Sequence, residues 1–298
     1  MWRLLILRCS FVMTDKRCNG VNQKYVWSST VGGTIASNNA FYLPKDLRCC
    51  LIGKSSAGKT TLLLHMLLED GILDWDNLIL CGKSHHQLQY KVLIAGLAKG
   101  FNKSQIRALF EQQKRIDEFG GVDKFLQHYE GVWKGTDLTF KIISDLDELP
   151  DPSELDAKRK NILILDDVMT SPKQHKAQAY FCRGRHSNCS VFFIAQNYFR
   201  LNRSTIRENS NLFIFFSQDR KNLIHIYQDH CSEDELSFSQ FSSFCNRVWR
   251  SGRRNIVVLD TTRQSECGKF RKNLTGYWSP QNEQRLSSSA AVSHLKKR

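Results

Sequence analysis

Short apolar runs recur along the chain between about residue 47 and residue 260, and they are separated by longer stretches with helical patterns. Runs of this kind that lack apolar–polar alternation are typical of strands buried on both faces of a parallel sheet. We interpret six runs as strands: 47–52, 77–82, 161–167, 191–195, 212–216 and 256–260. Alternation of such strands with helices predicts an α/β fold, a three-layer sandwich around a mostly parallel central sheet.

Helical patterns fill most of the intervals between these runs. The segment 135–160 is the exception, because it is polar and contains Pro150 and Pro152. We interpret it as a surface excursion ahead of the next strand. The helices expected from periodicity are 61–68, 87–98, 104–119 and 220–228.

Two further helices are expected from capping signals. Ser171 as N-cap, Pro172 at the first helical position and Gln174 two residues later predict a helix that ends at Gly184. The capping box of residues 232–235 predicts another helix start. The apolar residues that follow at helical spacing indicate core rather than a binding surface: Phe238, Phe241, Phe244, Cys245 and Val248.

The patterned region defines one folded domain, from about residue 41 to residue 278. Residues 1–40 are mixed and rich in Ser, Asn and Gly near their end, so we expect a loosely ordered lead-in. Met13 is an alternative initiator, because the first twelve residues resemble a signal peptide only faintly. Residues 279–298 are polar and end in basic residues, which predicts a disordered tail.

One stretch carries the clearest chemistry. It fits the phosphate-binding loop G-x-x-x-x-G-K-[ST] without a mismatch, between a predicted strand and a predicted helix. Its glycines let the backbone wrap closely around phosphates, while Lys59 would reach the β- and γ-phosphates and Thr60 would bind Mg²⁺. ATP and Mg²⁺ are therefore the expected cofactors. The loop consists of Gly53, Lys54, Ser55, Ser56, Ala57, Gly58, Lys59 and Thr60.

A pair of carboxylates ends the apolar run at 161–167. Open α/β sheets bind ligands at the carboxyl ends of their strands. Asp166 would hold Mg²⁺ directly or through water, and Asp167 would orient or deprotonate the attacking water. Gln196 follows the next apolar run in the same way.

The composition is that of a globular protein with an excess of positive charge. Among 298 residues, 43 are Lys or Arg and 29 are Asp or Glu, so the formal net charge is +14. This favours a polyanionic partner, either nucleic acid or an anionic membrane. No apolar run approaches the ~18 residues of a membrane-spanning helix, and the scattered cysteines suggest a reducing, intracellular setting.

A series of short motifs narrows the interpretation. The motifs are Gly184-Arg185-His186 before a strand that ends in Ala195-Gln196, and Ile206-Arg207-Glu208-Asn209 before the strand at 212–216. Together with the P-loop and the acidic pair, they resemble the FtsK/HerA superfamily of P-loop ATPases over about residues 45 to 260. Within it, the chain is most similar to the genome-packaging ATPases of large eukaryotic DNA viruses and of virus-like Maverick/Polinton elements.

The resemblance implies roles for individual residues. Lys59 and Thr60 match the phosphate and Mg²⁺ groups, and Asp166 and Asp167 match the acidic pair, although many relatives have Glu where Asp167 stands. Gln196 matches the glutamine thought to sense the γ-phosphate. Arg185 matches an arginine that is supplied to the ATP of a neighbouring subunit. The rival candidates for this arginine finger are Arg207 and Arg183.

The resemblance also implies an ATP-driven translocase of double-stranded DNA that works as a homo-oligomeric ring and packages a genome into a capsid. Such a protein would act inside the host nucleus or cytoplasm, or in the virion, with a capsid or portal protein as a further partner. Sequence-independent phosphate contacts would suit a motor. The candidate DNA contacts are Arg247, Arg250, Arg253 and Arg254, and the cluster Lys158-Arg159-Lys160.

Three other functions fit parts of the pattern. A P-loop nucleotide kinase would share the phosphate site, but no Arg-rich lid segment is evident between residues 100 and 160. A non-enzymatic nucleotide-binding scaffold would not need the intact Asp167 and Gln196. A membrane-surface protein would use the positive charge, yet no basic amphipathic helix is evident.

Overall fold

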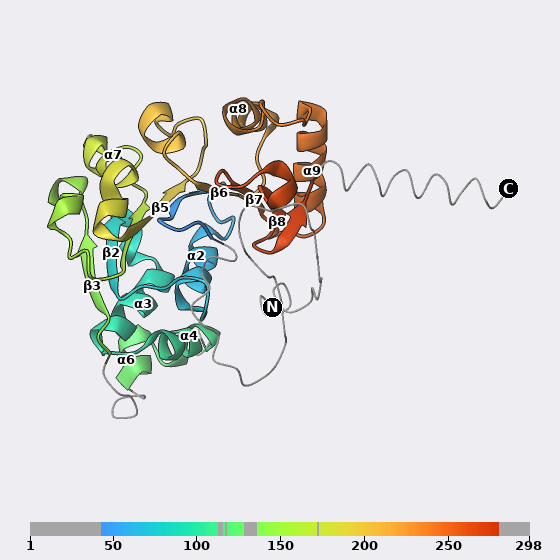
Figure 1. Cartoon of the computed structure of the whole chain (residues 1–298). Helices are drawn as coiled ribbons and strands as arrows, with labels where there is room; N and C mark the ends of the chain where they lie inside the picture. Colours follow the sequence, from blue (N-terminus) through green and yellow to red (C-terminus); the bar gives the residue numbers. More distant parts are fainter. Residues whose placement is uncertain (1–42, 113–115, 117, 128–135, 172, 280–298) are drawn as a thin grey trace.

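The computed structural model describes residues 43–112, 116, 118–127, 136–171 and 173–279. The predicted lead-in of residues 1–40 and the tail beyond Ser279 lie outside this part of the chain. The described strands form one sheet in the order β3-β2-β4-β5-β1-β6-β7-β8-β9 (Figure 1). Their bounds are β1 Arg48–Ile52, β2 Asn77–Gly82, β3 Thr139–Ile143, β4 Asn161–Asp166, β5 Cys189–Ala195, β6 Leu212–Phe215, β7 Val257–Asp260, β8 Phe270–Lys272 and β9 Gly276–Trp278.

All six strands predicted from apolar runs are present, as β1, β2, β4, β5, β6 and β7. The strands from β3 to β6 along the sheet pair in parallel, whereas β7, β8 and β9 extend the sheet in antiparallel fashion. The mostly parallel α/β fold expected from the sequence is therefore confirmed.

The surface excursion expected at 135–160 is wrong in part, because Thr139–Ile143 forms β3 and pairs with β2. This strand lies at the edge of the sheet, and Thr139 and Lys141 are exposed. An edge strand with a solvent-facing side shows no continuous apolar run, so the buried-strand pattern did not detect it.

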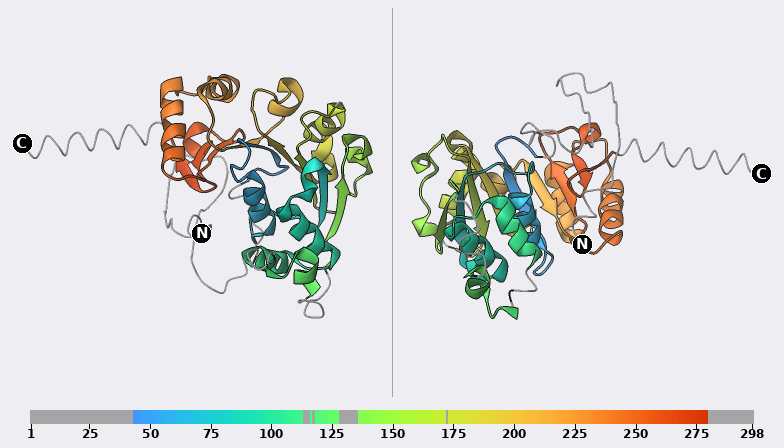
Figure 2. Two further views of the ribbon diagram at one scale, coloured as in Figure 1. Left: turned by 180° about the vertical axis from the view of Figure 1, so that it is seen from behind. Right: turned by 90° about the horizontal axis from the view of Figure 1, so that it is seen from below.

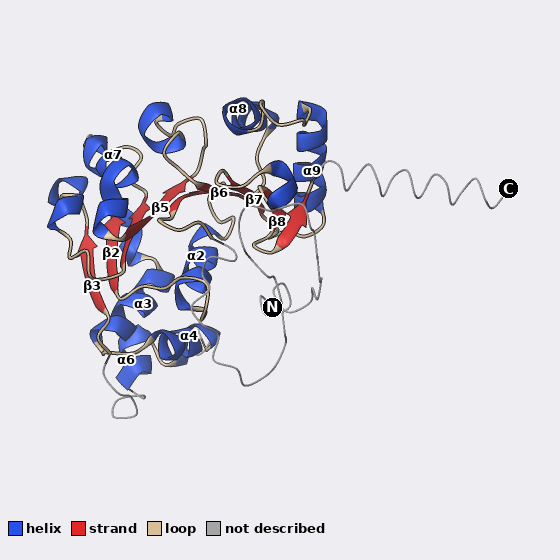
Figure 3. Ribbon diagram, in the orientation of Figure 1, coloured by secondary structure: helices blue, strands red, loops and turns tan. Residues whose placement is uncertain are grey.

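Helices cover both faces of the sheet, which makes the three layers visible in Figure 3. In Figure 2, the blue-to-teal helices lie on one side of the strands and the yellow-to-orange helices on the other. One layer contains α2 Lys59–Leu68, α3 Leu88–Ala98, α4 Lys103–Glu111 and α6 Val122–Gln127. The opposite layer contains α7 Gln174–Arg183, α8 Arg220–His230 and α9 Phe238–Arg250.

Each layer has its own apolar core, and β4 shows how the strands divide between them. Ile162 and Ile164 pack with the α2–α3 layer, whereas Leu163 and Leu165 pack with the α7–α9 layer. Successive side chains of a strand point to opposite faces, so Asp166 continues the row of Ile162 and Ile164 toward α2 and α3.

Both bounds of one predicted helix differ from those of the structure. The helix expected at 104–119 begins at Lys103, and α4 ends at Glu111; residues 113–115 and 117 lie outside the described residues. A separate short helix, α6, follows and was not predicted.

The two predicted cap positions are also wrong. α7 begins at Gln174 with Lys173 as N-cap, while Pro172 lies outside the described residues. The Gln174 side chain donates to the Ser171 carbonyl, and the helix does not extend back to Ser171. α9 begins at Phe238, because Ser237 and Gln240 form the capping box that the sequence suggested for residues 232–235.

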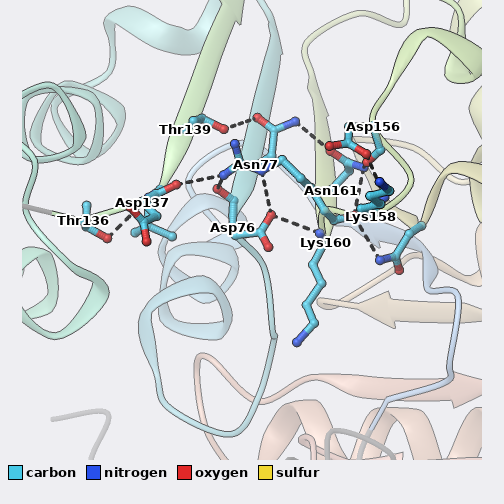
Figure 4. A network of polar contacts seen from close by, with 12 residues as sticks. Asp76, Asn77, Thr136, Asp137, Thr139, Asp156, Lys158, Lys160 and Asn161 are labelled. Atoms are coloured by element: carbon cyan, nitrogen blue, oxygen red, sulfur yellow. Dashed lines mark hydrogen bonds and ion pairs between the residues drawn. The ribbon is translucent and has the colours of Figure 1, made fainter.

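Amide side chains tie the amino ends of three strands together (Figure 4). Thr139 donates to Asn77 at 2.8 Å, and the Asn77 amide donates to Asn161 at 2.7 Å. The buried Asn161 amide in turn donates to the carbonyl of Ser187 at 2.9 Å. This chain of hydrogen bonds favours one register for β3, β2 and β4, and so helps to align their carboxyl ends.

A buried ion pair joins the antiparallel strands. The side chains of Asp260 in β7 and Arg271 in β8 pair with each other and have no exposed surface. Arg263 also contacts Asp260, at 3.2 Å. Removal of Asp260 would therefore leave the buried Arg271 guanidinium without this carboxylate.

We therefore expect Asp260→Asn to lower the free energy of unfolding by about 3–5 kcal/mol, since Arg271 would stay buried without its carboxylate. Asp147→Asn is the matched control, because Asp147 pairs with Lys173 at 2.7 Å on the exposed surface. Loss of an exposed pair costs less than about 1 kcal/mol. Urea unfolding curves of the two variants measure the difference, and equal midpoint shifts would contradict the prediction.

Candidate active site

The P-loop leaves β1 at Gly53 and enters α2 at Lys59, as the motif predicts. It is held between the carboxyl ends of two neighbouring strands. The Gly53 amide donates to the Ala195 carbonyl of β5 at 3.1 Å, and the Phe216 amide, directly after β6, donates to Ile52 at 2.9 Å. A Cβ on Gly53 would lie 2.7 Å from the Cβ of Phe216, so only glycine fits at this point of the loop.

The backbone of the loop turns through left-handed conformations. Gly58 has φ +104° and forms the N-cap of α2, and Ser56 has φ +59°. The first turn of α2 contains no acidic residue. No side-chain carboxylate in this turn competes for the free backbone amides and the positive dipole end of α2. They are therefore available to a phosphate group bound in the loop.

Lys59 lies folded against the loop that precedes it. Its Nζ donates to the carbonyl of Gly53 at 2.6 Å and to that of Lys54 at 2.9 Å. Burial lowers the pKa of Lys59, and the nearby Asp166 carboxylate opposes this effect. Lys59 and Asp166 are thus close enough to interact electrostatically, on the same edge of the sheet.

Asp166 is the acidic residue that points into the site, and it is only 7% exposed. The Tyr90 hydroxyl donates to its Oδ2 at 2.8 Å. Thr60, in the first turn of α2, lies near the same tyrosine and influences its pKa. Burial raises the pKa of Asp166, while Tyr90 and Lys59 partly offset that rise. The Thr60 hydroxyl and the Asp166 carboxylate are oxygen ligands that suit Mg²⁺, so the residues present fit this ion.

Gln196 follows β5, the strand next to the P-loop strand, and Asp167 follows β4, one strand further along the sheet. Asp167 is exposed and has φ +59°, a left-handed conformation that turns the chain sharply after β4. Gln196 is exposed and directly follows Ala195, whose carbonyl accepts from Gly53. The parallel register pairs Ile52 with Ala195 and Asp166 with Ile194. It therefore brings Gln196 and both carboxylates to the edge that carries the P-loop.

The three arginines considered as fingers differ in their surroundings. Arg185 is exposed and precedes β5. Burial lowers the pKa of Arg48, and the positive charge of Arg185 lowers that pKa further, so Arg185 lies near the start of β1. Arg185 therefore lies at the amino ends of the strands, whereas the P-loop lies at their carboxyl ends. Arg183 is exposed and pairs with Asp151 at 2.7 Å.

Arg207 is buried and paired with Asp229, so it cannot extend to another subunit. It also lies over the ring of Tyr198, 5.0 Å from the centroid. Tyr198 donates to Asp229 at 2.7 Å and lies 2.8 Å from His230 Nε2. This network connects the segment after Gln196 to α8, which gives Arg207 a structural role instead of the finger role suggested as an alternative.

The candidate DNA contacts fall into two groups. Arg159 and Lys160 pair with Asp76 and Asp74 at the amino ends of the strands, so the cluster Lys158-Arg159-Lys160 is largely committed to local contacts. Arg247 and Arg250 line a hollow on the outer face of α9, together with Ser243, Asn246 and Ser251. Arg253 and Arg254 are exposed directly after that helix.

Two residues of the site were not identified from the sequence. Tyr90 was interpreted only as part of an apolar helix, and no spacing linked it to Thr60 or Asp166. Gly82 was interpreted as the end of a strand, but it has φ +141°, and a Cβ there would lie 1.7 Å from the backbone oxygen of Asp166. A glycine at the last position of a buried strand was the signal available for this close approach.

Searches for related proteins found similar folds among solved structures. The genome-packaging NTPase B204 of Sulfolobus turreted icosahedral virus 2, in complex with AMP, aligns at 14% identity and a TM-score of 0.46, over 78% of this chain and 98% of that chain. VirB4 of Thermoanaerobacter pseudethanolicus aligns at 13% identity and 0.41, over 78% and 90% of the two chains. EssC (ATPases 2 and 3) of Geobacillus thermodenitrificans aligns at 10% identity and 0.38, over 85% and 44%.

The first of these structures is a viral genome-packaging NTPase, the class that the sequence motifs resemble. Because all three TM-scores lie below 0.5, the function is inferred from the residues of the site itself. No family model and no curated protein matches the chain. Among the described residues, no helix is both long and apolar enough to cross a bilayer.

The close approach of Gly82 to Asp166 gives a direct test of the site. We expect Gly82→Ala to displace the end of β4 and to reduce ATP turnover by about 100-fold, because misplacement of a site group by ~1 Å has effects of this size. Gly71→Ala is the matched control: Gly71 also has positive φ, at +81°, but a Cβ there would meet nothing within 4 Å. Steady-state ATP turnover is measured for both variants. Equal turnover in Gly82→Ala and Gly71→Ala would contradict the prediction.

Proposed function

We propose that the chain is an ATPase that moves double-stranded DNA as a homo-oligomeric ring, and that it packages the genome of a virus or virus-like element into a capsid. The observation that carries the ATPase part is the buried Asp166 carboxylate, which accepts from the Tyr90 hydroxyl and interacts with Lys59 of the P-loop. Asp167 and Gln196 lie along the same edge of the sheet.

ATP would be bound through its phosphates by the amides of residues 53–60 and by Lys59. Mg²⁺ would be held by Thr60 and Asp166 and would neutralise charge on the β- and γ-phosphates. Asp167 is exposed beside this site and is the candidate to orient or deprotonate the attacking water. Gln196, on the strand between the P-loop and the carboxylates, is the candidate sensor of the γ-phosphate.

The arrangement of Arg185 supports a ring. Arg185 lies at the amino edge of the sheet, so it does not reach the P-loop of its own chain, which lies at the carboxyl edge. Head-to-tail packing of subunits would bring one chain's amino edge to its neighbour's nucleotide, because heterologous interfaces that close form rings. Arg185 would then stabilise the transferring phosphoryl group only when the subunits dock.

The net charge of +14 supports DNA as the polyanionic partner. Exposed arginines at the end of α9, including Arg250, Arg253 and Arg254, are the candidate phosphate contacts. A capsid or portal protein as a further partner, and action inside the host cell or virion, belong to the same proposal. The first alternative function is a nucleotide kinase, which would use the same phosphate site. The second is a nucleotide-binding scaffold, which would not hydrolyse ATP.

The first experiment measures ATP turnover by the purified chain with and without duplex DNA, together with its oligomeric mass. We expect duplex DNA to raise turnover several-fold, and Lys59→Ala and Asp167→Asn each to lower it by about 100-fold or more, since Lys59 acts on the developing charge and Asp167 on the attacking water. A phosphorylated nucleoside product would indicate a kinase. Unchanged rates of ATP loss in both variants would contradict the proposal.

The second experiment tests whether Arg185 acts on a neighbouring subunit. We expect Arg185→Ala to lower turnover by ~10³-fold or more, whereas Arg183→Ala, on the same face, has little effect. An equal mixture of the Arg185→Ala and Lys59→Ala chains should regain activity, because about a quarter of random interfaces combine an intact finger with an intact P-loop. A mixture that stays inactive would place the arginine's action within one chain.

A further inference from the structure

One tyrosine lies inside the candidate magnesium site, on a helix that none of the sequence motifs includes. Tyr90 belongs to α3, and its side chain has no exposed surface. Its hydroxyl donates to Asp166 Oδ2 at 2.8 Å, and Thr60 lies close enough to influence the pKa of the same tyrosine. Side chains from the first turn of α2, from α3 and from the end of β4 therefore lie together.

The hydrogen bond between Tyr90 and Asp166 has a defined direction. An ionised carboxylate only accepts hydrogen bonds, whereas a phenol has one O–H donor, so Tyr90 donates to Asp166. A carboxylate has about four lone-pair sites, so this bond leaves others for a cation.

The surroundings of Tyr90 hold it in this orientation. Its ring is part of the apolar core between the sheet and the α2–α3 layer, which also contains Leu63, Leu93 and Ile164. A tyrosine packed on all sides has few rotamers open to it. The hydroxyl is therefore held in a fixed position as a hydrogen-bond donor to Asp166.

We propose that Tyr90 is a positioning residue of the magnesium site, whose hydroxyl holds the Asp166 carboxylate beside Thr60 in the orientation that binds Mg²⁺ together with ATP. The inference rests on the proposed nucleotide site, and it is independent of DNA translocation. Groups that orient metal ligands in this way affect metal affinity by about 10–100-fold when they are removed.

The test is Tyr90→Phe in the full chain, which removes the hydroxyl and leaves the ring. Binding of AMPPCP is titrated calorimetrically at increasing Mg²⁺ and in EDTA, so that the readout does not depend on turnover. We expect the half-saturating Mg²⁺ concentration to rise about tenfold or more, while affinity in EDTA stays close to that of the unmodified chain.

Tyr180→Phe is the matched control. Tyr180 is another fully buried tyrosine, and it lies in the opposite layer, where its hydroxyl donates to the Pro150 carbonyl at 2.9 Å. Its loss should leave the Mg²⁺ dependence unchanged. Thermal unfolding in EDTA shows that both variants are folded. If Thr60 and Tyr90 act at one magnesium site, the losses in Thr60→Ala and Tyr90→Phe will be non-additive.

The inference is overturned if Tyr90→Phe has the same Mg²⁺ dependence as the unmodified chain, or if Tyr180→Phe shifts it equally. If the unmodified chain itself shows no Mg²⁺-dependent binding of AMPPCP, the proposed nucleotide site fails as well. If that binding is present and shifts only in Tyr90→Phe, the inference is supported even where duplex DNA leaves ATP turnover unchanged.

Discussion

The parallel alignment of β1, β5 and β4 is the constraint on which the rest of the structure depends. Because these strands run in one direction with a fixed register, the residues that follow them meet at one edge of the sheet. The P-loop, Gln196 and the acidic pair are far apart in sequence and become neighbours only through this alignment. The hydrogen bonds of Asn77 and Asn161 at the opposite ends of the strands favour the register that produces it.

The site also buries a carboxylate, which is unfavourable for its charged form. Asp166 lies in the row of apolar side chains that faces α2 and α3, and its pKa is raised because the charged form is poorly solvated there. The Tyr90 hydrogen bond and the Lys59 charge offset part of this cost. A buried carboxylate with incomplete compensation is suited to binding a cation, because a divalent ion supplies the missing positive charge.

The carboxyl and amino ends of the parallel strands carry different functional residues. The carboxyl edge carries the phosphate loop and the residues expected to act on ATP, whereas the amino edge carries the exposed Arg185 near the start of β1. Beyond β6, the antiparallel strands β7 to β9 widen the sheet and are joined by the buried pair of Asp260 and Arg271. The exposed arginines at the end of α9 lie in this added part, away from the P-loop in sequence and separated from it by β6 in the sheet.

By itself, the sequence determined the P-loop, the strands with continuous apolar runs and the polar residues that end them, because each is a local pattern with its own physical cause. It did not reveal β3, whose exposed positions break the apolar run, or the true start of α9, where a second capping box lies close by. Only the tertiary structure showed that Arg207 is buried with Asp229, that Gly82 lies against the Asp166 backbone, and that Tyr90 donates to Asp166. These are contacts between elements, and they depend on how helices pack on the sheet, which no local spacing specifies.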